Sequence, residues 1–150
     1  MSNNTVAQVI RHARFLLNLT QEEAGQLVGV TRRAWEHWEN ETREMSKAAF
    51  ELFIAKISGQ VRSHLTHSDD QQLVVVTADD GVTPIDVVSS QNFLSLRQDK
   101  VTETLIINSL AIDRFSGKSY KHQVRFSTRG NEHVISAARK WQQSLNSAIA

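Results

Sequence analysis

The sequence predicts an α+β protein, in which an all-helical N-terminal part of four or five helices precedes a small antiparallel β-sheet with a C-terminal helix. Three observations predict this class. Apolar residues recur at helical spacing up to residue 58, β-branched runs alternate with turn residues after residue 72, and a polar stretch, SGQVRSHLTHSDDQQ, lies between the two patterns. We therefore expect a helical domain over residues 1–58, a linker over 59–71 and an α+β domain over 72–150.

Capping residues delimit the helices of the first part. The helices should cover about 5–18, 20–28, 31–41 and a segment from 46, with N-caps at Asn4 or Thr5, Thr20, Thr31 and Ser46. Thr20 and Glu23 have the spacing of a capping box, in which the hydroxyl and the carboxylate each bond the other residue's backbone amide. Gly29 can take the left-handed conformation that ends a helix, so the second helix should stop there.

Turn chemistry organises the second part. DDGV separates strand patterns at 72–78 and 83–88, and RFSGKSY separates 101–113 from 121–127, so both pairs are predicted hairpins. Residues 92–97 are too short to assign. Asn131 should cap a last helix with one apolar stripe, formed by Val134, Ala138, Trp141, Leu145 and Ile149. Trp141 and Leu145 either cover the sheet or form a dimer surface.

Composition limits the function classes. The 150 residues contain 40% apolar side chains, enough for a core, and 17 basic against 16 acidic residues, so a nucleic-acid surface would need local segregation of charge. The chain has no cysteine, which excludes disulfides and thiolate zinc sites. No apolar run is long enough to span a membrane, and the N-terminus does not look like a secretory signal, so we expect a cytoplasmic protein without a membrane partner.

The segment TRRAWEHWENE, residues 31–41, separates into two faces when it is drawn as a helix. With about 100° between successive residues, Trp35 and Trp38 fall on one side and should pack against the other helices. A polar set lies on the other side or at the N-terminal flank and should face outward: Arg32, Arg33, Glu36, His37 and Asn40.

LTQEEAGQLVGVTRRAWEHWEN, residues 19–40, resembles the helix-turn-helix of the lambda repressor, Cro and Xre family of DNA-binding proteins. The resemblance covers about residues 4–57 and says nothing about residues 70–150. It implies that helix 20–28 positions the domain and that helix 31–40 enters the major groove. The DNA contacts it implies are Gln21 on a phosphate, Thr31, Arg32 and Arg33 toward the bases, and Asn40, Thr42 and Arg43 on the sugar-phosphate backbone. In the exposed middle of the helix, Glu36 either accepts from a cytosine or only pairs with Arg32 or Arg33, and His37 contacts a phosphate or a base.

The resemblance also assigns structural roles. Glu39 matches a family glutamate that commonly pairs with an arginine of the first helix, here Arg14, which implies a partly buried salt bridge. Two positions depart from the family pattern. Trp35 replaces the usual isoleucine or valine, and Glu41 replaces the usual glycine, so both the core and the path of the chain after the third helix should differ.

Other chemistry-bearing residues give weaker signals. His64 and His67 have a metal-compatible spacing, but chance explains it better without further ligands nearby. SGKS, residues 116–119, lacks the first glycine of a phosphate-binding loop. Asp79, Asp80 and Asp86 surround a hairpin and are interpreted as turn formers. We therefore expect no catalytic residues, no metal and no cofactor, and no enzymatic activity.

These observations predict a sequence-specific transcriptional regulator that binds double-stranded DNA, most simply a homodimeric repressor, or autorepressor, on a palindromic operator. Such a protein would be associated with the nucleoid when bound, and the resemblance suggests a phage, a plasmid or another mobile element. The C-terminal domain would serve dimerisation, a role inferred from need. Two alternatives remain: an antitoxin whose C-terminal domain binds a toxin, and a ligand sensor with a pocket between the sheet and the Trp141 helix.

Overall fold

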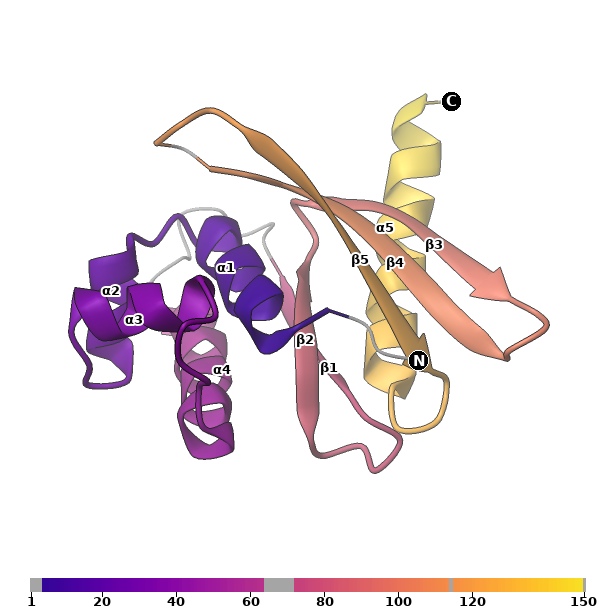
Figure 1. Cartoon of the computed structure of the whole chain (residues 1–150). Coiled ribbons are helices and arrows are strands. Elements are labelled where there is room, and N and C mark those ends of the chain that lie inside the picture. Colours follow the sequence, from indigo (N-terminus) through magenta and orange to yellow (C-terminus); the bar gives the residue numbers. More distant parts are fainter. Residues whose placement is uncertain (1–3, 64–71, 114, 150) are drawn as a thin grey trace.

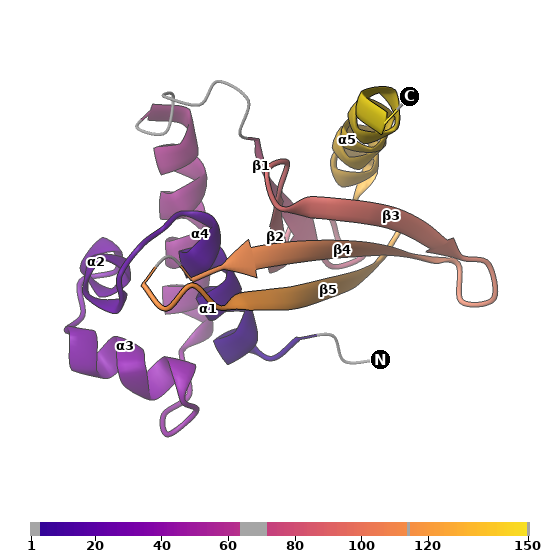
Figure 2. The same cartoon turned by 90° about the horizontal axis from the view of Figure 1, so that it is seen from above.

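The computed structural model describes residues 4–63, 72–113 and 115–149. The described residues form five helices and two antiparallel sheets, which confirms the α+β class. In chain order the elements are α1 (Val6–Leu16), α2 (Gln21–Leu27), α3 (Arg32–Glu39), α4 (Lys47–Ser63), β1 (Leu73–Thr77), β2 (Pro84–Ser89), β3 (Phe93–Asp99), β4 (Thr104–Ile112), β5 (Ser119–Ser127) and α5 (Glu132–Ile149). Helices α1 to α4 gather at one end of the molecule, next to β1 and β2, and the other strands extend away with α5 beside them (Figures 1 and 2).

The helix starts follow the predicted caps. The Thr5 hydroxyl accepts from the amide of Gln8, whose side chain accepts in turn from the Thr5 amide, so Thr5 rather than Asn4 caps α1. Thr20 and Glu23 form the predicted capping box at α2. Thr31 caps α3 through the amide of Ala34.

Two boundaries differ from those the sequence suggested. Helix α4 continues to Ser63, into the first residues of the predicted linker. The rest of that segment, including His64 and His67, lies outside the described residues. Helix α3 ends at Glu39, two residues before the predicted end, because the chain turns at Asn40 and Glu41.

The strands form two sheets instead of one. Strands β1 and β2 pair as the first predicted hairpin, and β4 and β5 pair as the second. Strand β3, which the sequence left unassigned, adds to the free edge of β4 to give the order β3-β4-β5. Only Phe93 of this strand is buried, and its other residues are half-buried or exposed without regular apolar alternation, the pattern that identifies a half-buried strand.

One hydrophobic cluster crosses the predicted domain boundary. It contains core residues of α1 to α4, such as Ile10 and Phe53, together with Val87 of β2 and Ala111 of β4. The second cluster joins all five strands to α5. The division into 1–58 and 72–150 stays a prediction, but the helical part and the sheets share buried apolar surface and so stabilise each other.

Helix α5 covers the inner face of the strands. The ring of Trp141, 9% exposed, packs edge to face on Phe93 with 5.4 Å between ring centroids. Of the two interpretations of this stripe, covering the sheet is the one that Trp141 fulfils. Leu145 is 37% exposed, so a dimer contact through this stripe would fall to Leu145 rather than to Trp141.

Asn131 occupies the predicted cap position directly before α5, where its carbonyl accepts from the Ile135 amide, but its side chain bonds other elements. Its buried side chain bonds the backbone of β1 in both directions: Oδ1 accepts from the Thr77 amide at 2.9 Å, and Nδ2 donates to the Thr77 carbonyl at 2.9 Å. Nδ2 also donates to the Ser127 carbonyl at the end of β5. Asn131 thus joins the two sheets where α5 begins. None of the described helices is long and apolar enough to cross a membrane.

Candidate nucleic-acid interface and a buried histidine–aspartate cluster

The turn between α2 and α3 is closely packed. The Val30 amide donates to the Gly25 carbonyl at 2.9 Å, and a Cβ on Gly25 would lie 2.9 Å from the Val30 carbonyl oxygen. Gly29 has a φ of +75°, which a glycine adopts without strain. These two glycines let four residues, 28–31, connect α2 to α3, so the relative position of the two helices is fixed by backbone contact.

Glu39, at the end of α3, is the centre of a buried polar network. Its carboxylate forms a two-point ion pair with Arg14 of α1, with Nε at 2.7 Å and Nη2 at 3.0 Å. The Trp35 indole nitrogen also donates to this carboxylate, and Gln21 donates at 3.3 Å. Arg11 donates to the Glu39 carbonyl. The predicted Arg14–Glu39 salt bridge is present, and the network connects α1, α2 and α3.

The residues expected at DNA and those expected to be structural differ in exposure. Six of the expected DNA contacts are exposed: Thr31, Arg32, Arg33, Asn40, Thr42 and Arg43. The other three are half-buried: Gln21, Glu36 and His37. Of the structural residues, Trp38 is half-buried and three are buried: Arg14, Trp35 and Glu39. All six exposed residues lie on α3 or on the turns at its two ends. Gln21, expected on a phosphate, points its amide nitrogen at Glu39 and so also braces α3.

The outward face of α3 carries donors and acceptors of both signs. Arg32 pairs with Glu36 one turn later at 2.8 Å, in an exposed ion pair of little net energy. Arg33 has no ion-pair partner among the described residues. The His37 ring contacts the Thr42 hydroxyl at 2.6 Å, which shapes the turn after the helix.

The chain turns after α3 at Asn40, Glu41 and Thr42. Glu41 has a φ of +65°, the left-handed conformation that a glycine would take at this position. The amide and hydroxyl of Thr42 both donate to the Asn40 side-chain oxygen, which holds the turn closed. The turn therefore places a non-glycine residue in the left-handed region, at some cost in backbone strain.

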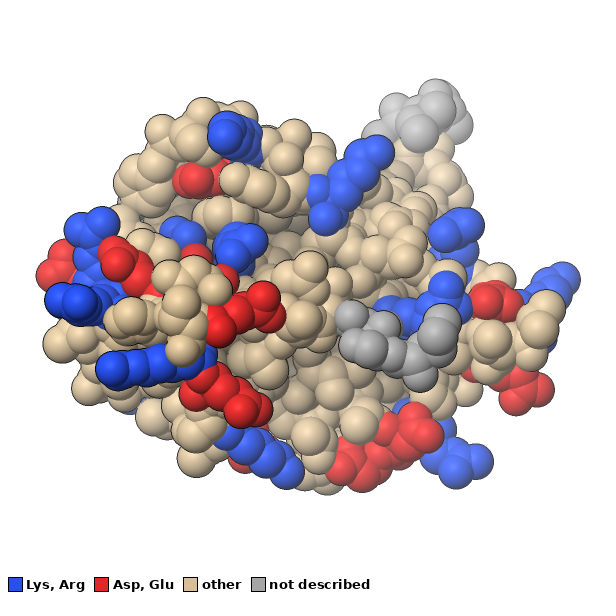
Figure 3. Space-filling view, viewed as in Figure 1, with Lys and Arg blue, Asp and Glu red and all other residues tan. Residues whose placement is uncertain are grey.

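Charge does not form one large basic field on the face shown in Figure 3. Lys and Arg side chains lie among Asp and Glu side chains over α2 and α3. On this face, attraction for a polyanion would therefore come from single cations and not from a continuous basic patch.

A second polar site lies where α1 meets the strands. Asp86 of β2, 1% exposed, accepts from His122 of β5, with Nε2 2.8 Å from Oδ2. Its other oxygen accepts from the Val87 amide and lies 3.8 Å from Nδ1 of His12 on α1. The two imidazole rings stack, with centroids 3.6 Å apart and planes 12° apart. Neither ring nitrogen of His12 has a hydrogen-bond partner among the described residues.

The protonation states in this cluster follow from burial and charge. Burial acts to raise the pKa of Asp86, but the two neighbouring histidines outweigh it and hold the pKa at about 2. Burial lowers the pKa of His12, an effect that the Asp86 carboxylate only partly offsets. The cluster therefore combines an ionised carboxylate with a neutral imidazole at pH 7.

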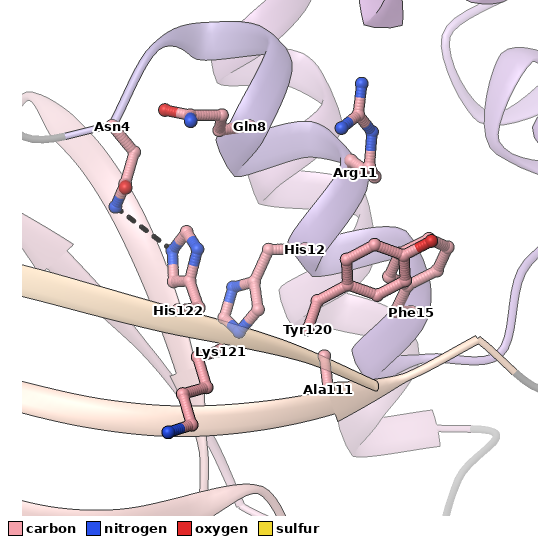
Figure 4. Close-up of a pocket in the computed structure, with 9 residues that line it drawn as sticks. All are labelled: Asn4, Gln8, Arg11, His12, Phe15, Ala111, Tyr120, Lys121 and His122. Atoms are coloured by element: carbon pink, nitrogen blue, oxygen red, sulfur yellow. Dashed lines mark hydrogen bonds between the residues drawn. The ribbon is translucent and has the colours of Figure 1, made fainter. Parts of the chain in front are cut away.

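A small cavity of about 140 Å³ opens beside the two rings. Figure 4 shows His12 and His122 side by side on its wall, with Asn4 directed toward them. The Asn4 amide donates to Asp86 Oδ2 at 3.0 Å and to the Gln123 carbonyl at 2.8 Å, so it holds the carboxylate in place. His12 and His122 line this cavity and Asp86 does not, so the cavity borders the imidazole side of the cluster.

Sequence reasoning missed this cluster. Asp86 was assigned to the turn, but it lies within β2 and only Asp80 caps the turn, by accepting from Val82 and Thr83. One signal was available: His122 has the same strand phase as Val124 and Phe126, and all three side chains are buried. The pairing of Asp86 and His122 with His12 comes from the tertiary fold.

Comparisons with protein-family models, with curated proteins and with solved structures found no match.

Proposed function

We propose that the protein is a sequence-specific DNA-binding regulator in which α2 and α3 form a helix-turn-helix and α3 is the recognition helix. The observation that carries the proposal is the division of α3 into two faces. One face is fixed to α1 and α2 through Trp35 and Glu39, while Arg33 and its exposed neighbours point to solvent. A helix that reads bases needs both properties, because the contacts are specific only if the helix is held rigidly.

Arg33 is the strongest candidate for base contact. It lies in the first turn of α3, near the helix end that enters the groove in proteins of this class, and no carboxylate pairs with it among the described residues. A guanidinium matches the O6 and N7 acceptors of guanine, and such a pair contributes about 1–3 kcal/mol of discrimination. We expect Arg43, which is exposed on the turn after α3, to contact phosphate instead.

One recognition helix covers only a half-site, so we propose that the protein acts as a homodimer on a palindrome, with half-sites about 34 Å or a multiple of it apart. Repression of a promoter within that site is the simplest outcome. The proposal is testable without knowing the operator, since selection from random DNA reports both the bound sequence and its symmetry.

The first experiment is therefore selection from random duplexes, followed by anisotropy titration of the enriched site and of a scrambled site. Arg33→Ala should weaken binding to the enriched site by roughly 5- to 150-fold and relax the preference at one base position. Arg43→Ala should weaken both duplexes alike and reduce the salt dependence by about one phosphate contact.

Arg139→Ala is the matched control, because Arg139 is an exposed arginine on α5 and its loss removes the same charge. It should leave affinity within about twofold of the unchanged protein, because it lies outside the proposed contact face. Failure to enrich any sequence, or an equal loss on both duplexes for Arg33→Ala, would contradict the reading role of α3.

A further inference from the structure

The His12–Asp86–His122 cluster has the composition of a metal site. Each residue offers one ligand atom, and the three atoms lie within 4.8 Å of one another. In a tetrahedral zinc site the bonds are about 2.0–2.2 Å long, which places neighbouring ligand atoms roughly 3.3 Å apart. The Asp86 carboxylate spans the two imidazoles, with Oδ2 2.8 Å from Nε2 of His122 and Oδ1 3.8 Å from Nδ1 of His12, so each pair lies within about 1 Å of the tetrahedral spacing.

His12 supplies the observation that points to a ligand. Its imidazole is almost fully buried, yet neither nitrogen has a hydrogen-bond partner among the described residues. A buried polar atom without a partner is unfavourable, and native proteins rarely keep one without a reason. A cation bound at Nδ1, the nitrogen nearer to Asp86, would satisfy it.

The surroundings fit this role as well. Asn4 donates to Asp86 Oδ2 and so orients the carboxylate as outer-shell groups do in metal sites. The 140 Å³ cavity beside the rings leaves room for a water as a fourth ligand and gives the ion a path of entry. The three residues come from α1, β2 and β5, so an ion would join the helical part to both sheets.

We propose that His12, Asp86 and His122 bind one divalent first-row transition-metal ion, with Zn²⁺ as the expected ion. Two imidazoles and one carboxylate suit Zn²⁺ or its neighbours, whereas Mg²⁺ and Ca²⁺ require six or more oxygen ligands. Binding requires two local changes. His122 moves its proton from Nε2 to Nδ1, so that Nε2 presents a lone pair, and the stacked rings turn apart so that both nitrogens point to the ion. This proposal is independent of DNA binding.

The test uses the untagged full chain, stripped with a chelator and titrated with Co²⁺. The expected result is one equivalent of Co²⁺ with visible ligand-field absorption that Zn²⁺ abolishes by competition. Zn²⁺ in hundredfold excess over its Kd should raise the Tm by about 5–10 °C, and the same concentration of Mg²⁺ should not. A chain that shows neither the absorption nor a zinc-specific rise in Tm overturns the proposal.

His12→Phe is the decisive variant, because it keeps a stacked ring and removes two nitrogens that have no hydrogen-bond partner among the described residues. It should fold and bind Co²⁺ at least about 100-fold more weakly, and Asn4→Ala should weaken binding by about 10-fold. His133→Gln, at an exposed position of α5, is the matched control, and the double variant His64→Gln/His67→Gln tests the second histidine pair. Both should bind as the unchanged chain does.

Two outcomes of the variant series overturn the assignment. One is His12→Phe binding as tightly as the unchanged chain, and the other is loss of binding in His64→Gln/His67→Gln, which would place the ion elsewhere. If His12→Phe does not fold, Asn4→Ala decides in its place, since unchanged affinity in that variant would remove the ion from the cluster.

Discussion

The Glu39 carboxylate should be among the most costly single groups to neutralise in the helical part. Glu39→Gln keeps the shape of the side chain but removes the negative charge that compensates the Arg14 guanidinium, and both residues are buried. Leaving a buried charge without its partner costs about 3–5 kcal/mol. For a chain of this length each kcal/mol lowers the Tm by about 2–4 °C, so the Tm of Glu39→Gln should fall by roughly 6–20 °C.

The assay is urea unfolding followed by circular dichroism, with Glu36→Gln as the matched control. Glu36 lies on the same helix and undergoes the same chemical change, but its ion pair with Arg32 is exposed. Glu36→Gln should therefore cost no more than about 0.5 kcal/mol. A double variant, Arg14→Met with Glu39→Leu, removes both charges and should be less destabilised than the sum of the two single changes.

Similar losses in the free energy of unfolding for Glu39→Gln and Glu36→Gln would contradict this prediction. That result would mean that the Arg14 guanidinium finds water or another acceptor when the carboxylate is gone, and that the network positions α3 without contributing appreciably to the free energy of unfolding.

Two further predictions concern the contacts that hold α3 in place. Trp35→Ala should lower the free energy of unfolding by about 3–5 kcal/mol, as the loss of a fully buried aromatic side chain does. Trp38→Ala should cost less, because Trp38 is only half-buried. Equal losses in urea unfolding would contradict the assignment of Trp35 to the centre of the core. Gly25→Ala should lower the free energy of unfolding by about 1–3 kcal/mol although alanine favours helices, because its Cβ would press on the Val30 carbonyl. A variant as stable as the unchanged chain in the same assay would show that α2 and α3 can separate at little cost.

The features predicted correctly from sequence are those set by neighbouring residues. The capping box of Thr20 and Glu23 and the two hairpins depend on side chains and turn residues a few positions apart, so their spacing determines them. The Arg14–Glu39 pair spans 25 positions, and it was found because a family resemblance supplied the register that spacing alone lacks.

The features missed are those that depend on tertiary pairing. Strand β3 forms because β4 offers an open edge, not because its own sequence alternates. Asp86 and His122 are 36 positions apart, and His12 lies in the helical part, so no local pattern brings them together. The split into two sheets was missed for the same reason, since hairpin signals define pairs of strands and not how the pairs associate.

Helix α1 connects the two candidate sites. Three of its residues face different partners within one turn and a half: Arg14 pairs with Glu39 of α3, Phe15 stacks on Tyr120 of β5 at 5.1 Å, and His12 reaches Asp86 and stacks on His122. The helix that fixes the proposed recognition helix is therefore itself packed on the strands.

Because α1 packs on the strands, truncating the chain would disturb the helical part as well. Removing residues 72–150 would expose the side of α1 that carries His12 and Phe15, and it would take Val87 and Ala111 out of the shared core. Weak DNA binding by such a fragment could therefore result from lost packing as well as from lost dimerisation. Point variants in the full chain separate these effects. Loss of the Leu145 side chain leaves the core intact, because that residue is exposed, whereas changes at His12 alter the contact between α1 and the strands without touching α3.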